Sequence, residues 1–332
     1  MPQGQRRRKT VKSIKILTPA TMMPFVADQL AETFTLLKLP APGPDRDKAI
    51  TEWAPDVRGI AVAGHLACSA EMLARFPKLE IVANFGVGYD SVDAKWAGQH
   101  GIIVTNTPEV LTDEVADTCL GLLLMTVREL PQSEQWLRAG NWTGKGPYPL
   151  THNTLRGKKI GIFGLGRIGK AIAKRLEAFG VEIAYHNRSK AADVSYPYHD
   201  SLVGLAKAVD ILVSVAPGGP ETFHLINADV FKALGPQGTF INIGRGSAVD
   251  EPALIKALQD GTIYAAGLDV FENEPQVPAE FLTLDRVVLL PHVGSGSHHT
   301  RNLMGQLVVD NLRNFFAGKG PITPVAETPW KK

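Results

Sequence analysis

Residues 159–190, KIGIFGLGRIGKAIAKRLEAFGVEIAYHNRSK, decide the fold of this chain. The apolar run Lys159–Phe163 predicts a strand, and a glycine-rich turn follows it directly. A helical pattern then continues to about Phe179, and Val181–Tyr185 predicts a second strand. This order is a β-α-β unit, the building block of a parallel sheet with helices packed on it.

The turn has the pattern Gly-x-Gly-x-x-Gly, formed by Gly164, Gly166 and Gly169. In this context Gly164 allows a tight turn, Gly166 lets the backbone approach a pyrophosphate, and Gly169 lets the helix pack closely. The helix N-terminus, with Arg167 and Ile168, then presents free N–H groups to an anion. The pattern therefore predicts a dinucleotide-binding Rossmann unit.

The end of the second strand carries no acidic residue for the adenosine ribose of NAD. Asn187 occupies the position, and Arg188, Ser189 and Lys190 follow it. Arginine binds phosphate with two parallel hydrogen bonds, so this loop favours NADP(H) over NAD(H). The alternative is that the loop is simply a solvated basic segment.

Short apolar strands alternate with helical stretches along most of the chain, which indicates an α/β protein with two sheets in succession. The strands expected in the first sheet are Ile14–Leu17, Leu36–Leu39, Gly59–Ala63, Glu80–Asn84 and Ile102–Thr105. After the two strands of the β-α-β unit, the second sheet continues with Asp210–Val215, Thr239–Ile243, Ala265–Val270 and Val287–Leu290. The last strong helix is expected from about Ser297 to Phe316.

Length and composition agree with two globular domains. The chain has 332 residues, against a usual domain size of about 150, with 44% apolar and 20% charged residues. A net charge of +2 argues against nucleic-acid or membrane binding as the main role. The basic run Arg6–Lys9 is interpreted as a solvated leader, with a targeting or nucleic-acid-binding tail as the alternative. Two cysteines, with neither a disulfide framework nor a zinc site, favour the cytoplasm, and we expect no metal.

A long helical pattern runs from about Asp113 to Leu137 and joins the two series of strands. Its middle, Leu120–Val127, is apolar on nearly every side. Such a helix must be buried by its own core or by another subunit. We therefore expect a homodimer formed through the helix around 113–137.

Three further expected strands end in polar residues, at the edge where open α/β sheets bind ligands. The segments are Gly244-Arg245-Gly246, Gly267 to Pro275 with Asp269, Glu272 and Glu274, and Leu289 to Ser295 with His292. Taken separately each has an ordinary structural explanation. Together they place a cation, carboxylates and a histidine at one edge of the sheet, which are groups from which a catalytic mechanism can be assembled.

In these segments and the glycine motif, the chain resembles the D-isomer-specific 2-hydroxyacid dehydrogenase family over about Ser13 to Val325. It is most similar to glyoxylate/hydroxypyruvate reductases and hydroxyphenylpyruvate reductases. The resemblance implies a Rossmann domain, residues 112–296, inserted in a discontinuous flavodoxin-like substrate domain, residues 1–111 and 297–332. It also implies that Arg245 holds the substrate, that His292 is the acid/base, and that Glu274 is its carboxylate partner.

Further roles rest on the same resemblance. Backbone N–H groups of Val87 and Gly88 would bind the substrate carboxylate together with Arg245 and His292, and Asp269 would hold the nicotinamide carboxamide. Pro217 would also contact the cofactor, although Gly218 and Gly219 depart from the usual pattern there. The complete set of expected cofactor-binding residues is Gly164, Gly166, Arg167, Ile168, Asn187, Arg188, Ser189, Lys190, Pro217 and Asp269.

The resemblance implies NADPH-dependent reduction of small 2-oxoacids, glyoxylate or hydroxypyruvate, to D-2-hydroxyacids. Three alternatives remain: a hydroxyphenylpyruvate reductase, a 2-ketogluconate reductase, or a homologue that senses dinucleotides without catalysis.

Overall fold

The computed structural model describes residues 12–331 except residues 20 and 64–65. The basic run Arg6–Lys9 lies outside the described residues. The chain divides into two compact units, one formed by residues 1–111 with 298–332 and the other by residues 112–297. Each unit is described by itself.

The first unit contains a parallel five-stranded sheet in the order β2-β1-β3-β4-β5, which is the flavodoxin-like order. Its strands are β1 (Lys15–Pro19), β2 (Thr35–Leu39), β3 (Val57–Val62), β4 (Ile81–Asn84) and β5 (Ile103–Thr105). All five strands that the sequence predicts here are confirmed, with ends that differ by at most two residues.

Helices cover both faces of this sheet because successive strand residues point to opposite sides. Ile16 packs in one core with α2 (Pro24–Thr33) and α13 (His298–Phe316), through Val26, Leu30 and Val308. Leu17 packs in the other core, which includes side chains from three further helices. These helices are α3 (Pro44–Trp53), α4 (Ala70–Ala74) and α5 (Ala94–Gln99).

The second unit contains a parallel six-stranded sheet in the order β11-β10-β9-β8-β6-β7. Its strands are β6 (Lys159–Phe163), β7 (Glu182–His186), β8 (Ile211–Ser214), β9 (Thr239–Asn242), β10 (Ala265–Leu268) and β11 (Val287–Leu289). The chain proceeds from β6 to β7 on one side and then crosses to β8 on the other. The crevice between β6 and β8 is therefore the switch point, where sheets of this kind bind ligands.

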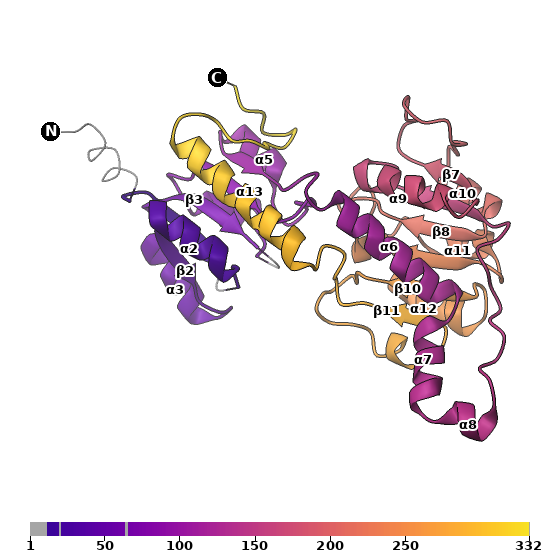
Figure 1. Cartoon of the computed structure of the whole chain (residues 1–332). Coiled ribbons are helices and arrows are strands. Elements are labelled where there is room, and N and C mark those ends of the chain that lie inside the picture. Colours follow the sequence, from indigo (N-terminus) through magenta and orange to yellow (C-terminus); the bar gives the residue numbers. More distant parts are fainter. Residues whose placement is uncertain (1–11, 20, 64–65, 332) are drawn as a thin grey trace. The chain divides into compact units, whose positions relative to one another are not determined.

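Two helical layers enclose the six-stranded sheet (Figure 1). One layer consists of α10 (Leu202–Ala208), α11 (Ala228–Leu234) and α12 (Glu251–Gln259), whose side chains share a core with Ala266 and Leu268. The other layer contains α6 (Thr112–Val127) and α9 (Arg167–Glu177). A Cβ atom at Gly267 would lie 2.4 Å from Thr126 Oγ1, so glycine is what lets α6 pack directly on β10.

The expectation of one helix over 113–137 is wrong. The structure has α6, ending at Val127, and a separate α7 (Leu130–Arg138), with Glu129 between them at φ +50°. The cause is Pro131, which has no N–H to donate to the carbonyl of Val127 and whose ring clashes with that carbonyl in a continuous helix.

The apolar middle of α6 is covered mainly by its own unit. Leu122, Leu123, Thr126 and Val127 are buried, whereas Leu120 is half-buried. The core of the unit therefore accounts for most of the apolar surface from which the sequence predicts a dimer.

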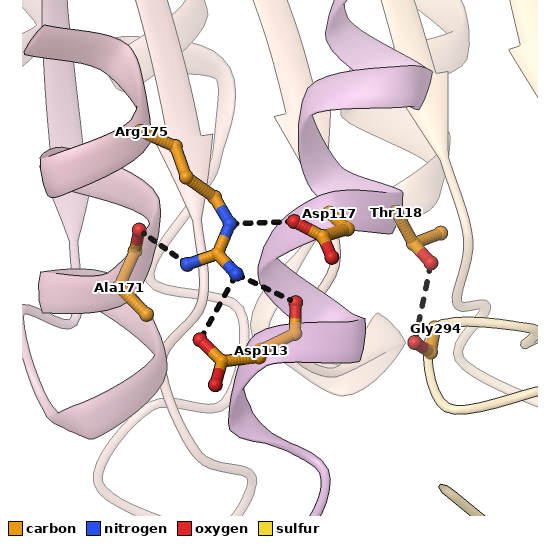
Figure 2. A network of polar contacts seen from close by, with 6 residues as sticks. All are labelled: Asp113, Asp117, Thr118, Ala171, Arg175 and Gly294. Atoms are coloured by element: carbon orange, nitrogen blue, oxygen red, sulfur yellow. Dashed lines mark hydrogen bonds and ion pairs between the residues drawn. The ribbon is translucent and has the colours of Figure 1, made fainter. Parts of the chain in front are cut away.

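An arginine fastens α6 to α9 (Figure 2). Arg175 on α9 donates to Asp117 at 2.6 Å and to Asp113 at 2.9 Å, and these acceptors raise the pKa of its guanidinium. On the same helix, the Thr118 hydroxyl donates to the carbonyl oxygen of Gly294 at 3.2 Å. The first turns of α6 are thus attached both to the helix that follows the glycine turn and to the loop that follows β11.

Both cysteines are buried as free thiols, and burial raises the pKa of Cys68 and of Cys119 to about 12. None of the helices in the described part of the chain is long and apolar enough to cross a membrane. Among the described residues there is also no group of three or more His, Cys, Asp or Glu side chains placed to hold a metal ion.

Candidate active site

The glycine turn after β6 is a close-packed structure. Gly164 has φ +100°, and a Cβ atom there would lie 2.7 Å from the backbone nitrogen of Ala216. A Cβ atom at Gly169 would lie 2.4 Å from the carbonyl oxygen of Gly164. Both positions therefore need glycine for the fold itself.

Gly166 differs from these two glycines. It has φ −87°, which any residue can adopt, and a Cβ atom there would meet nothing within 4 Å. Neither packing nor backbone conformation explains a glycine at this position. The open space lies at the N-terminus of α9, where Arg167 and Ile168 begin the helix, and a pyrophosphate would fit it.

The loop after β7 contacts the glycine turn through Asn187. Its Oδ1 atom accepts a hydrogen bond from the backbone N–H of Leu165 at 2.6 Å. Arg188, Ser189 and Lys190 follow as exposed residues, and Arg188 pairs with Glu221 at 2.6 Å. Glu221 belongs to the loop after β8 that also contains Pro217.

Arg245 follows β9, which adjoins β10, the strand that precedes Glu274; β11, which precedes His292, lies on the other side of β10. Its carbonyl oxygen accepts from Asn242 Nδ2 at 3.0 Å, and its guanidinium donates to the carbonyl of Gly244 at 2.9 Å. A Cβ atom at Gly246 would lie 1.8 Å from the carbonyl carbon of Phe271. Glycine is thus required for the loops after β9 and β10 to touch.

His292 and Glu274 form a hydrogen-bonded pair. Nδ1 of His292 lies 2.6 Å from Oε2 of Glu274, and the other carboxylate oxygen accepts from the N–H of Phe271 at 3.0 Å. The His292 side chain is 46% exposed and that of Glu274 only 18%. The imidazole is therefore accessible and held at Nδ1 by its partner, which leaves Nε2 for an external group.

The loop that contains His292 is held by a buried carboxylate. Asp269 is 1% exposed, and its two oxygens accept from the N–H groups of Val293 at 2.7 Å and Gly294 at 2.9 Å. The backbone N–H of His292 donates to the Asp269 carbonyl at 2.8 Å, and His292 has φ +53°. Burial raises the pKa of Asp269, and the two N–H donors oppose that shift.

A second histidine–carboxylate pair adjoins the first. His224 Nε2 lies 2.9 Å from Oε1 of Glu272, two residues before Glu274. The backbone N–H of Glu272 donates to Glu251 at 2.9 Å, and burial raises the pKa of that carboxyl group. Glu251 begins α12, so this helix anchors the turn that contains Glu274.

Val87 and Gly88 lie in the first unit, in the loop after β4. Asn84 Nδ2 donates to the carbonyl oxygens of Gly86 and Gly88, and Asn106 Nδ2 donates to that of Val87 at 2.8 Å. Within residues 12–331, apart from 20 and 64–65, no acceptor is found for the N–H groups of Val87 and Gly88.

Comparison with known proteins matches residues 120–294 to the NAD-binding domain of the D-isomer-specific 2-hydroxyacid dehydrogenases. A hydroxyphenylpyruvate reductase from Plectranthus scutellarioides is 45% identical, covering 95% of this chain and all of the relative. A glyoxylate/hydroxypyruvate reductase from Arabidopsis thaliana is 44% identical with the same coverage. The chain belongs to the D-isomer-specific 2-hydroxyacid dehydrogenase family.

A solved structure from Sinorhizobium meliloti agrees with this assignment. It is an NADPH-dependent glyoxylate/hydroxypyruvate reductase in complex with NADP and malonate, 52% identical, with a TM-score of 0.90. The match covers 96% of this chain and 99% of that chain. The chain is therefore an oxidoreductase with a Rossmann domain, and its cofactor is a nicotinamide dinucleotide.

The sequence did not single out several residues that hold this site together. Asn242, Glu251 and Thr118 each form a hydrogen bond to a loop that contains a candidate catalytic residue. His224 pairs with Glu272 in one of these loops. Asn242 stands just before the Gly-Arg-Gly segment, which is a usable signal for a loop-fixing amide. For Glu251 and His224 there is no local signal, because their partners are 21 and 48 residues away.

Replacing Gly166 by alanine should separate ligand binding from folding. We expect Gly166→Ala to change the free energy of unfolding by less than about 0.5 kcal/mol, because the methyl group meets open space. The same methyl group should weaken dinucleotide binding at least about tenfold, since it occupies the path of a pyrophosphate. Thermal unfolding and a fluorescence titration with NADPH and NADH measure the two effects.

The control is Gly164→Ala, which we expect to destabilise the protein by more than about 1 kcal/mol because alanine is strained at this positive φ. Parent-like dinucleotide affinity in Gly166→Ala would show that the open space is not the pyrophosphate site.

Proposed function

We propose that this enzyme reduces small 2-oxoacids, glyoxylate and hydroxypyruvate, to D-2-hydroxyacids with NADPH. The observation that carries the proposal is the 2.6 Å contact between His292 and Glu274 in a dinucleotide-binding domain. These two residues follow β11 and β10, and β10 adjoins β9, the strand that precedes Arg245. The names of the relatives from Arabidopsis thaliana and Sinorhizobium meliloti support the same substrates.

His292 is the proposed general acid. Glu274 contacts Nδ1 and orients the ring, so the proton for the substrate leaves from Nε2. It passes to the carbonyl oxygen as negative charge develops there. When bound, the nicotinamide supplies the hydride.

Arg245 is the proposed substrate clamp. Its guanidinium stays cationic and can bind a carboxylate through two hydrogen bonds, and it polarises an adjacent carbonyl group. The contacts of Asn242 and Gly246 fix the backbone from which it extends. We also propose Val87 and Gly88 as substrate-binding residues, since their N–H groups suit a carboxylate.

The proposed cofactor site consists of the glycine turn with Arg167 and Ile168, the loop Asn187–Lys190, Pro217, and Asp269. Arg188, Ser189 and Lys190 give it a preference for the 2′-phosphate of NADPH. Asp269 already accepts two backbone N–H groups, and a carboxylate oxygen has capacity for a further donor such as a carboxamide.

Hydroxyphenylpyruvate is the second candidate substrate. The relative from Plectranthus scutellarioides, named a hydroxyphenylpyruvate reductase, is as similar to this chain as the glyoxylate/hydroxypyruvate reductase from Arabidopsis thaliana. Both candidate substrates undergo the same reduction at the 2-oxo group. The choice between them therefore depends on the room that the site leaves for the substrate side chain.

A cytoplasmic location is part of the proposal. It rests on Cys68 and Cys119, which are both unpaired and buried. Proteins of reducing compartments keep their cysteines in this state.

The reaction is tested by following oxidation of NADPH and of NADH with glyoxylate, hydroxypyruvate, hydroxyphenylpyruvate and 2-ketogluconate. We expect turnover with glyoxylate and hydroxypyruvate and a preference for NADPH of at least about tenfold in kcat/KM, the worth of one charge-assisted hydrogen bond. The preference should shrink as salt rises. Binding of NADPH with no oxidation on any 2-oxoacid would instead indicate a dinucleotide sensor, and equal use of NADH would refute the role of the basic loop.

A homodimer is also proposed, with its contact surface on α7 and α8 (Asn141–Lys145). Here Leu130, Leu137 and Trp142 are 46%, 54% and 62% exposed, and α7 has no buried residue. Large apolar side chains gathered on one exposed segment are typical of a protein interface.

Light scattering at micromolar concentration should give about twice the 35.9 kDa of one chain. Leu137→Asp should shift the mass toward the monomer because the interface would have to bury a charge. Val203→Asp is the matched control, because Val203 is 44% exposed on α10, in the helical layer on the other face of the sheet. A monomer mass for the parent protein would refute the dimer.

A further inference from the structure

The ion pair of Arg188 and Glu221 spans the end of strand β6. Arg188 follows β7 and Glu221 follows β8, and in the sheet β6 lies between these two strands. Neighbouring strands are about 4.8 Å apart, so a link between the ends of β7 and β8 must bridge about 10 Å. The guanidinium and the carboxylate meet at 2.6 Å, on the side of the sheet where the glycine turn lies.

Glu221 is held in a defined turn. The Thr222 hydroxyl donates to the carbonyl oxygen of Pro217 at 2.7 Å, and the Thr222 N–H donates to that of Gly219 at 3.1 Å. Gly219 has φ +127°, a conformation that favours glycine. The turn that begins with the unusual Gly218-Gly219 pair therefore directs this carboxylate toward Arg188.

A second acidic side chain, three residues after the basic loop, is engaged elsewhere. Asp193 pairs with Lys170 on α9 at 2.5 Å. Glu221 is thus the carboxylate that contacts the guanidinium on which the proposed NADPH preference depends.

We propose that Glu221 is a specificity-determining residue that lowers the preference for NADPH by occupying Arg188. This inference rests on the proposed cofactor site. A 2′-phosphate must replace the Glu221 carboxylate on the guanidinium, whereas the 2′-hydroxyl of NADH leaves the pair intact. The exchange is feasible because both side chains are largely exposed, and exposed ion pairs are weak.

Adenosine 2′,5′-bisphosphate and 5′-AMP test this without turnover, since they differ only in the 2′-phosphate. Calorimetric titration of Glu221→Gln should show the bisphosphate bound about threefold to tenfold more tightly than by the parent, because the competing charge is gone. Affinity for 5′-AMP should stay within about twofold. The matched control is Glu182→Gln, since Glu182 is as exposed as Glu221, is also in an ion pair, in its case with Lys159, and begins β7 at the opposite end of that strand.

A double-mutant cycle tests the mechanism. If Glu221 acts by occupying Arg188, the gain from Glu221→Gln should vanish when Arg188 is already glutamine. Unchanged or weaker binding of the bisphosphate by Glu221→Gln, or the same gain without Arg188, would overturn the proposal. Failure of the proposed cofactor site would be seen separately, as equal affinities of the parent for the bisphosphate and 5′-AMP.

Discussion

The geometry of the loop that contains His292 depends on the buried carboxylate of Asp269. The side chain of Asp269 accepts hydrogen bonds from two successive backbone N–H groups. The backbone carbonyl of Asp269 accepts a third hydrogen bond, from the N–H of His292. These three hydrogen bonds hold His292 at a positive φ that a histidine rarely adopts. The backbone conformation directs the imidazole to Glu274, and thereby determines which ring nitrogen remains available to a substrate.

The rest of the site follows from the parallel order of the sheet. Strands β9, β10 and β11 are neighbours, so their carboxyl ends bring Arg245, Glu274 and His292 to one edge although they are distant in sequence. Glycines allow the closest approaches: Gly246 lets two of these loops touch, and Gly164 lets the dinucleotide turn rest on the end of β8. Small residues therefore make this edge of the sheet compact, and the charged residues on it are the ones that we propose for the chemistry.

Most of the fold could be predicted from the sequence because its signals are local. Strand periodicity and the glycine turn place every strand to within about two residues. The helix break at Pro131 also had a local signal, the proline itself, which the apolar pattern obscured. Side-chain partnerships such as Asn187 with Leu165, Asp269 with Val293, and Arg188 with Glu221 could not be predicted, because they depend on which loops the sheet order brings together.

The central claim is that His292, held by Glu274, donates a proton to the carbonyl oxygen of the 2-oxoacid as it is reduced. Its most direct test is the turnover of His292→Gln compared with His299→Gln, an exposed histidine on α13. We expect kcat of His292→Gln to fall at least about 100-fold, the usual scale for a positioned acid, with NADPH affinity and thermal stability unchanged. His299→Gln should turn over like the parent. Near-parent kcat in His292→Gln would contradict the account and assign the acid to another group.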